Sequence, residues 1–577
     1  MGGARTGEVL AGLDVPLRRS GWILVRSAAS RHDGLLHRDS SQRDVLAVFP
    51  SIPARLLLSL VCGSILVLSP RAWAQSYVAL MDGQRAVPLK GRFNQVPVLH
   101  SNQPEEVEGP GILISTVPGT AIAAENGIPV EMPAYTFNGE FGLHLHHKYF
   151  PTYRRSISAS QRRGELTLAT ILVNPKAEPV RIQFSAGAVR NSFEAPYLAQ
   201  HLMGVRPLGP RPWNTGPGDA TAVQLLRGRL DSQFKDTVIL PPKGRVVLFH
   251  TPLPALGIAN ALLKGRSDGP FQIVVLAAKN PQSDADLFAV MDQGRLAPGR
   301  VYLHRIPEIH AGTIFSRVGG VAIGDHYQSS LSHDLSLQGP LHVPLTSTRR
   351  THFGTGEVQV NPLATRVADS ALDNVGTYGV RFDVDLSLVG QGSYDIVLSH
   401  PSPVAGRAHF TAFRGSIEIR RPEGVQSVHV GLRSGQSLSL APLQLERGRS
   451  TPVRISLVYP ADSTPGHLLS IVPTTQLTEV QQRERRQPVA TDKPAVHRSP
   501  QMPAASPRKQ PARQRVVSPI LPPAEILRYP NTPNQTPPSP ARPSPQPQRS
   551  PGGGLADRYK DALDVQRRLL EQWHLSP

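Results

Sequence analysis

Short apolar runs separated by glycine and proline dominate the chain from residue 76 to about residue 475, and this pattern most constrains the fold. The runs are rich in Val, Ile, Leu and Phe, and turn residues recur roughly every 8–15 positions. Such spacing is typical of β-sandwiches and barrels. Helical periodicity is nearly absent, apart from a candidate short helix at residues 220–230. The sequence therefore predicts an all-β fold, with strand candidates at residues 166–173, 180–184, 245–249, 271–277, 378–386, 416–420 and 453–458.

Two parts of this region resemble each other at an offset of about 200 residues. The first part reads LATILVNPKAEPVRIQFSA (168–186) and then LPPKGRVVLFHTPLPA (240–255). The second part reads VRFDVDLSLVGQGSYDIVLSH (380–400) and then LERGRSTPVRISLVYPA (445–461). The alternative is chance likeness between strands bounded by Gly and Pro. We expect two β-sandwich-like domains, at residues 76–300 and 312–475, each long enough to bury a core.

An export signal precedes the β region. Arg55 is followed by the 13-residue apolar run LLLSLVCGSILVL (56–68) and then by Ala72-Trp73-Ala74. A basic residue, a short apolar core and a small-residue site together form a secretory signal peptide, whereas a membrane anchor needs about 20 apolar residues. We expect residues 54–74 to be a signal peptide cleaved after Ala74, and the exported protein to be periplasmic or extracellular. Residues 1–53 are interpreted as a mis-called start or a leader outside the fold.

Cysteine usage agrees with this interpretation and excludes two classes of protein. The chain has one cysteine, Cys62, and it lies inside the expected signal peptide. A single cysteine rules out a disulfide framework and a cysteine-rich zinc site. The exported protein would therefore depend on its apolar core for stability.

Composition changes sharply after residue 475. Residues 481–556 hold 18 prolines among 76 residues, and 12 Lys and Arg against three acids. Such a segment cannot bury enough apolar area to offset the entropy of ordering, which predicts a disordered basic Pro-rich linker. Residues 557–575 carry apolar side chains at helical spacing, which predicts a C-terminal amphipathic helix. That helix, from Leu555 to Leu575, would dock an unknown protein partner or fold back on the β domains.

The formal net charge is +19, and nearly half of it lies in residues 481–556. On an exported protein, such a segment would contact an anionic envelope polymer or a membrane surface. Nucleic acid is disfavoured as a partner, because the protein is expected to be exported. The segment also has Tyr529 as its one aromatic residue, and so lacks the interleaved aromatics of single-strand binders.

A histidine cluster is the strongest candidate for chemistry. Glu140, His144 and His146 would share one face of a strand, and His147 follows directly. Two imidazoles and a carboxylate could bind Zn²⁺ or a similar divalent metal. The alternative is a surface or edge-strand histidine cluster without a ligand. We expect no other cofactor.

Two further strings match short motifs for catalysis or nucleotide binding but lack the secondary structure that those motifs need. Residues 265–269 read G-R-S-D-G, which matches a nucleophile elbow, but a strand rather than a helix is expected to follow. Residues 317–324 are glycine-rich but lack a following helix, so dinucleotide binding is not indicated. Tyr197 and Trp213 are candidate glycan-stacking residues, although lone aromatics in Pro-rich loops usually pack locally.

An ordered set of short strings resembles a known family. They are PLKGRFNQVPVLHSN (88–102), GILIST (111–116), HH (146–147), ATILVNP (169–175), GPG (216–218), LRGR (226–229), SDGP (267–270), RVGGV (317–321), GTG (354–356), YG (378–379) and YP (459–460). Together, over about residues 82–475, they make the chain similar to the largely cyanobacterial family Domain of Unknown Function 3370. Residues 375–378 read VGTY, where a His-Gly-Asn-Tyr-like string is expected. The resemblance implies an exported protein with no assigned activity.

The sequence therefore favours an exported cell-envelope protein with a non-catalytic structural or binding role, in which the basic segment contacts anionic polymers or a partner. One alternative is a metal-dependent or carbohydrate-active envelope enzyme that uses Glu140, His144, His146 and His147. A second alternative is a glycan-binding module.

Overall fold

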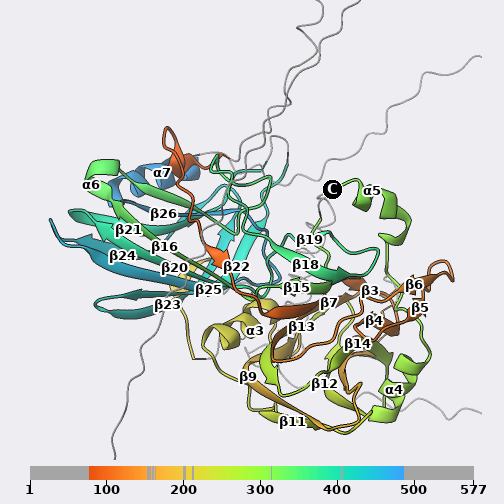
Figure 1. The fold of residues 1–577 in the computed structure, drawn as a ribbon. Coiled ribbons are helices and arrows are strands. Elements are labelled where there is room, and N and C mark those ends of the chain that lie inside the picture. Colours follow the sequence, from red (N-terminus) through yellow and green to blue (C-terminus); the bar gives the residue numbers. More distant parts are fainter. Residues whose placement is uncertain are drawn as a thin grey trace, which may run out of the picture. The chain divides into compact units, whose positions relative to one another are not determined.

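The computed structural model describes residues 77–486, apart from 152–156, 159–161, 163, 199–202, 211–213, 314 and 404–406 (Figure 1). The described residues all belong to one unit of the chain. Five sequence predictions lie outside them: the leader (1–53), the signal peptide (54–74), most of the Pro-rich linker, the C-terminal helix (557–575) and the stacking role of Trp213.

The first sandwich consists of a nine-stranded and a four-stranded sheet. In order, the larger sheet contains β11 (Thr237–Leu240), β9 (Val180–Asn191), β13 (Ile258–Ser267), β7 (Glu140–Tyr149), β2 (Pro97–Ser101), β15 (Gly319–Ile323), β18 (Asn361–Arg366) and β19 (Asp373–Asn374), with β3 (Glu106–Val107) beside β7. The smaller sheet contains β12 (Arg245–Leu253), β8 (Leu166–Val173), β14 (Gln272–Lys279) and β4 (Gly111–Ser115). Alternate side chains of both sheets, such as Leu143, Ile182, Leu168 and Ile273, meet in one apolar core.

The second sandwich repeats this plan with a seven-stranded and a four-stranded sheet. The larger contains β1 (Arg92–Phe93), β16 (His326–Asp334), β20 (Arg381–Val389), β25 (Thr451–Val458), β22 (Thr411–Arg421), β23 (Gly424–Arg433) and β10 (Gly204–Pro207). The smaller contains β17 (Leu341–Leu345), β26 (His467–Pro473), β21 (Gly392–Ser399) and β24 (Ser437–Leu445). Phe382, Ile417 and Ile455 face Leu398 and Ile471 across the second core.

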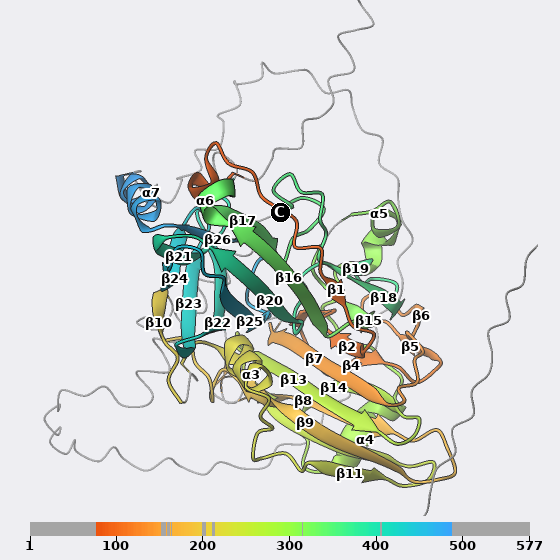
Figure 2. The ribbon, with the colours of Figure 1, turned by 60° about the vertical axis from the view of Figure 1, so that its left-hand side comes forward.

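The remaining described elements are short. They are the hairpin β5 (Thr120–Ile122) and β6 (Pro129–Glu131), the helices α3 (Pro217–Leu226), α4 (Asp284–Asp292), α5 (Ile306–His310), α6 (Leu335–Gln338) and α7 (Thr474–Arg486), and the 3₁₀ turns η1 (Ala79–Met81) and η4 (Leu303–Arg305). Helix α3 packs against both larger sheets (Figure 2). No helix in the described ranges is long and apolar enough to cross a membrane.

The predicted all-β, sandwich-like fold is confirmed. Strand β8 spans the same residues as its candidate, Leu166–Val173. Strand β13 ends at Ser267, within the G-R-S-D-G string, and the next element is strand β14 from Gln272 rather than a helix, so the string forms no nucleophile elbow. The candidate short helix at 220–230 corresponds to α3, shifted towards the N-terminus because Pro217 is favoured in the first turn.

The internal likeness has a counterpart in strand pairing. In the first copy, β8 pairs antiparallel with β12, and β9 lies in the opposite sheet of its sandwich. In the second copy, β20 pairs antiparallel with β25, and β21 lies in the opposite sheet. The two similar segments therefore share a pairing pattern, although the paired strands lie in the smaller sheet of the first sandwich and in the larger sheet of the second.

The two expected domains, 76–300 and 312–475, share strands. Strands β15, β18 and β19 join the nine-stranded sheet through the pairing of β15 with β2, while β1 and β10 join the seven-stranded sheet. A buried ion pair also links the two parts of the chain. Arg300 Nη1 lies 2.9 Å from Asp369 Oδ1, and both side chains are fully buried. The division into domains at 76–300 and 312–475 stays a prediction.

The start of the predicted disordered linker is wrong by six residues, because α7 continues to Arg486. Leu477 and Val480 of this helix pack on Val397, Leu468 and Val472 of the smaller sheet in the second sandwich. Burial of this apolar stripe stabilises a helix whose other residues are almost all polar. The composition of residues 481–486 does not reveal the sheet against which they lie.

Leu477→Ala tests whether α7 belongs to the folded body. The Leu477 side chain is 4% exposed, so its truncation should lower the free energy of unfolding by about 2–4 kcal/mol in a denaturant titration. Glu479→Ala, on the exposed side of the same helix, is the control and should change it by less than about 0.5 kcal/mol. Equal effects of the two substitutions would contradict the docking of α7.

Candidate functional site

Strand β7 carries the candidate histidines and lies in the interior of the nine-stranded sheet. It pairs with β2 on one side and with β13 on the other. Side chains alternate along β7, so Leu143 and Leu145 enter the core of the first sandwich. His144 and His146 project from the opposite face, towards α3 and the loops of the second sandwich. We use the name seam for the region where this face of β7, helix α3 and the loops of the second sandwich meet.

The interpretation of these histidines as a surface or edge-strand cluster is wrong. His144 and His146 are each 1% exposed, and His147 is fully buried. Strand β7 has neighbours on both sides, and the second sandwich covers the face that would otherwise meet water. A polar side chain in alternation with apolar ones usually indicates a solvated face, but here it indicates a second buried contact.

His144 faces another histidine across the sheet. Its Nδ1 lies 3.1 Å from Nδ1 of His100, the residue opposite it on β2, so one nitrogen donates to the other. Burial lowers the pKa of His100 to about 3. Burial, and then the nearby His100, lowers the pKa of His144 well below its usual value. Both imidazoles are therefore neutral at ordinary pH.

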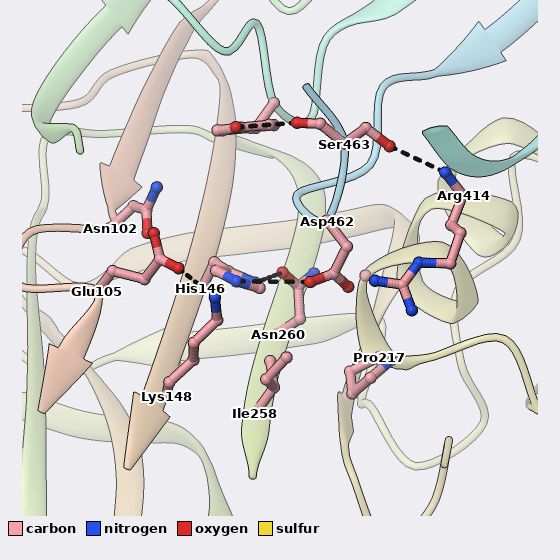
Figure 3. A network of polar contacts seen from close by, with 12 residues as sticks. Asn102, Glu105, His146, Lys148, Pro217, Ile258, Asn260, Arg414, Asp462 and Ser463 are labelled. Carbon is pink, nitrogen blue, oxygen red and sulfur yellow. Dashed lines mark hydrogen bonds and ion pairs between the residues drawn. The ribbon is translucent and has the colours of Figure 1, made fainter. Parts of the chain in front are cut away.

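His146 connects the two sandwiches. Its Nδ1 lies 3.0 Å from Asn260 Oδ1, and its Nε2 lies 3.9 Å from Asp462 Oδ1 (Figure 3). Asn260 in turn donates from Nδ2 to Thr221 Oγ1 of α3 at 2.5 Å. Burial lowers the pKa of His146, and the negative charges of Asp462 and Glu105 offset part of that effect. His146 is thus a neutral hydrogen-bonding residue in the seam.

Asp462 is the centre of a second set of contacts. The Tyr197 hydroxyl donates to Asp462 Oδ2, and the guanidinium of Arg414 lies 4.3 Å above the centre of the Tyr197 ring. The backbone N–H of Arg414 donates to Ser463 Oγ at 3.2 Å (Figure 3). Tyr197 is only 2% exposed, so it packs locally and cannot stack on a glycan.

A third set of contacts attaches the N-terminal end of α3 to the seven-stranded sheet. Asp219 accepts hydrogen bonds from Thr215 Oγ1 at 2.7 Å, Ser416 Oγ at 2.9 Å and His429 Nδ1 at 2.9 Å. Asp219 is 1% exposed. Three donors around one buried carboxylate offset much of the cost of removing it from water.

The glycines at the start of α3 allow this close approach. Gly216 has φ +100°, and a Cβ there would lie 1.9 Å from the Tyr197 ring. A Cβ on Gly218 would lie 2.7 Å from Asp462 Oδ2. The string GPG at 216–218 is therefore needed for the contact between α3, Tyr197 and Asp462.

A buried cluster of charged groups lies at the end of β7. Glu105 pairs with Lys148, and its Oε2 lies 2.5 Å from Nε of Arg317. Burial alone would raise the pKa of Glu105, but the charges of Arg317 and Lys148 outweigh it and lower the pKa to about 2. His147 closes this end, with Nδ1 donating to Pro104 O at 2.8 Å and Nε2 lying 2.8 Å from Ser101 Oγ.

The four candidate metal ligands do not gather at one point. Glu140 is exposed at the start of β7, four residues or about 13 Å along the strand from His144. His147 lies on the face opposite to His144 and His146. Among the described residues, no group of three or more His, Cys, Asp or Glu side chains could hold a metal ion. Metal binding stays a prediction, and elemental analysis of the purified protein is its test.

The seam contains residues that sequence reasoning did not single out as a group, notably Asp219, Arg414, His429 and Asp462. The one sequence signal for these residues was the family resemblance, because the strings GPG, YG and YP that carry it lie in or next to the seam. Residues 375–378, where the chain departs from the expected string, also lie here. The Tyr378 ring centre is 6.1 Å from that of His144, and its hydroxyl donates to Ser463 O at 3.1 Å.

Comparison with known families agrees with the sequence. A family model described as "Protein of unknown function (DUF3370)" matches residues 84–473, close to the predicted range of 82–475. No curated protein matches the chain. The side chains of the seam are at most a few per cent exposed, are largely hydrogen-bonded to one another and join the two sandwiches.

Glu105→Gln tests the buried charges at the end of β7. The substitution removes the negative charge from the buried pair with Lys148, in which both side chains are 4% exposed, and should lower the free energy of unfolding by about 3–5 kcal/mol. Glu446→Gln is the control, because it removes a pair with Arg449 in which both side chains are largely exposed. That change should be below about 1 kcal/mol.

The same residue predicts a pH dependence. The pKa of Glu105 is about 2 in the folded chain and 4.5 ordinarily, so its contribution is complete above pH 4.5 and is lost as the pH falls towards 2. The difference in unfolding free energy between wild type and Glu105→Gln should shrink over that window. A difference that stays constant down to pH 2 would contradict the lowered pKa.

Proposed function

The chain belongs to the family described as Protein of unknown function (DUF3370), and on that premise we propose that it is an exported, non-catalytic envelope protein that binds anionic polymers. Its place would be the periplasm or the extracellular side of the envelope. The observation that carries the proposal is the charge of the chain beyond α7. Residues 487–556 hold nine Lys and Arg against two acids, Asp492 and Glu525.

The position of this segment supports a tethered binding role. Helix α7, which ends at Arg486, packs on the second sandwich through Leu477 and Val480. The basic segment therefore continues from a fixed point on a folded body. Repeated positive charges with few acids attract polyanions at long range, and salt weakens that attraction.

The seam supports the non-catalytic part of the proposal. Acid–base catalysis needs a titratable group within reach of a substrate. The candidate histidines are at most 1% exposed, and burial keeps them neutral. Their hydrogen bonds run to groups of the same sheet, such as Asn260 and Ser101, while His146 also lies 3.9 Å from Asp462 of the second half of the chain.

Export is tested by the N-terminus of the protein recovered outside the cytoplasm. Cleavage after Ala74 should give a chain that begins at Gln75, as measured by mass spectrometry of the secreted or periplasmic fraction. Replacement of three leucines in the apolar run, Leu56, Leu57 and Leu58, with Arg should keep the protein in the cytoplasm. Equal export of this variant and the wild type would contradict the signal at residues 54–74.

Polymer binding is tested with the full chain and a variant in which the nine Lys and Arg of residues 487–556 are replaced with Gln. We expect affinity for dextran sulfate, and for vesicles containing anionic phospholipid, to fall about tenfold or more at low salt. The control replaces nine Ser and Gln of the same segment with Ala, which leaves the charge unchanged. Unaltered affinity of the neutralised variant would contradict the role of the segment.

A further inference from the structure

The seven-stranded sheet has an outer face that α3 covers only at one end. Phe382 and Val384 of β20 point into the core, so Arg381, Asp383 and Asp385 point outward. Figure 2 shows the strands of this sheet side by side, with α3 at one end. The face is hollowed beside the C-terminal end of α3 and again farther along the strands.

The first hollow, which we call the arginine groove, has a volume of about 570 Å³. Four arginines line it, Arg227, Arg229, Arg381 and Arg420, against the single acid Glu418. They come from the end of α3, the loop that follows it, and strands β20 and β22. The fold therefore gathers positive charge at one place from parts of the chain nearly 200 residues apart.

Backbone oxygens help to position two of these guanidinium groups, and for Arg381 a carboxylate does so as well. Arg227 donates to Gly209 O at 2.9 Å and to Pro210 O at 3.1 Å. Arg381 donates to Leu226 O at 3.2 Å and also to Asp383 Oδ2 at 3.0 Å. The carbonyls fix the position of the Arg227 guanidinium without cancelling its charge. Asp383, in contrast, forms an ion pair with Arg381, and Glu418 forms one with Arg420 at 3.2 Å. Arg227 and Arg229 line the same groove, and burial and then the charge of Arg229 lower the pKa of Arg227.

The second hollow continues from the first, because Arg420 lines both. Its volume is about 530 Å³. Arg420, Arg454, Asp385 and Ser330 stand opposite one another in register across β22, β25, β20 and β16. Three steps between neighbouring strands cover about 14 Å, so the face suits an extended chain better than a single small ion.

The side chains of the two grooves indicate the chemical class of the ligand. Their lining includes six arginines and two acids, together with serines such as Ser332, Ser387 and Ser427. Arginine binds carboxylate and sulfate groups through paired hydrogen bonds, and serine binds hydroxyl groups. The lining contains no aromatic residue on which bases could stack. Together these features favour an anionic polysaccharide over a nucleic acid.

We propose that the outer face of the seven-stranded sheet binds a linear anionic polysaccharide, with its acidic groups in the arginine groove and its hydroxyl groups along the second hollow. This inference rests on the proposed function and deepens it by giving the polymer a defined site on the folded body. The proposed polysaccharide site uses residues other than those of the basic segment. Experiments can therefore contradict one of the two binding sites without contradicting the other.

The test uses the full chain with Arg229→Glu and Arg420→Glu combined. Arg229 is exposed, and the Arg420 side chain is 60% exposed, so both substitutions are compatible with folding. The matched control combines Arg181→Glu and Arg295→Glu, two exposed positions outside both grooves with the same change in charge. Equal unfolding midpoints of the two double variants would confirm that both are folded.

The probes are polygalacturonate for carboxylates, dextran sulfate for sulfates, uncharged dextran and single-stranded DNA. We expect the groove variant to lose about tenfold or more in affinity for one or both anionic polysaccharides, and the control to lose less than about threefold. The polysaccharide with the larger loss identifies the acidic group. Equal losses in the two variants would overturn the proposal, as would tighter binding of DNA than of either polysaccharide.

The same pair of variants in the chain with a neutralised 487–556 segment separates the two proposals. A groove-dependent loss that persists in this background supports the arginine groove whatever the basic segment does. The opposite outcome has two parts: neutralising the 487–556 segment abolishes all binding, and the groove variant has no effect in the chain that keeps this segment. That outcome overturns the arginine groove and leaves the proposed function standing.

Discussion

The hydrogen bonds that cross the seam are the interactions on which the rest of the structure depends. Asp219 of α3 receives donors from β22 and β23, and Asp462 receives the Tyr197 hydroxyl. A carboxylate at this depth is costly unless such donors surround it. Each half of the chain supplies groups that the other half needs, so the seam is favourable only when both sandwiches are in place. The shared strands β15, β18, β1 and β10 reinforce the same requirement.

Helix α3 separates two environments with opposite properties. Its N-terminal end lies in the seam, where Asp219 has three donors and almost no contact with water. Its C-terminal end opens into the arginine groove, where Arg227 and Arg229 outnumber the nearby acid. Satisfied polar groups stabilise the body, whereas positive charges without enough acids leave a site for an anionic ligand. The same ten-residue helix thus helps to bury the seam at one end and lines the arginine groove at the other.

The fold could be predicted further than the site. The strand Leu166–Val173 was located to the residue, because a short apolar run between turn residues has few other solutions. Alternation along β7 correctly placed His144 and His146 on one face. It could not show that a second sandwich covers that face, so a surface or edge-strand cluster remained an open interpretation of the histidines. The end of α7 was missed for a similar reason, since residues 481–486 become helical against a distant sheet.

By itself, the sequence determined the all-β class, the positions of many strands and the family, because these follow from patterns within a few residues of one another. It also determined the charge of the basic segment, which depends on composition alone. Only the tertiary structure decided which polar residues meet. Tyr197 and Asp462 are 265 positions apart, and Asp219 and His429 are 210 apart. No local pattern specifies such contacts, because they arise from the packing of one sandwich against the other.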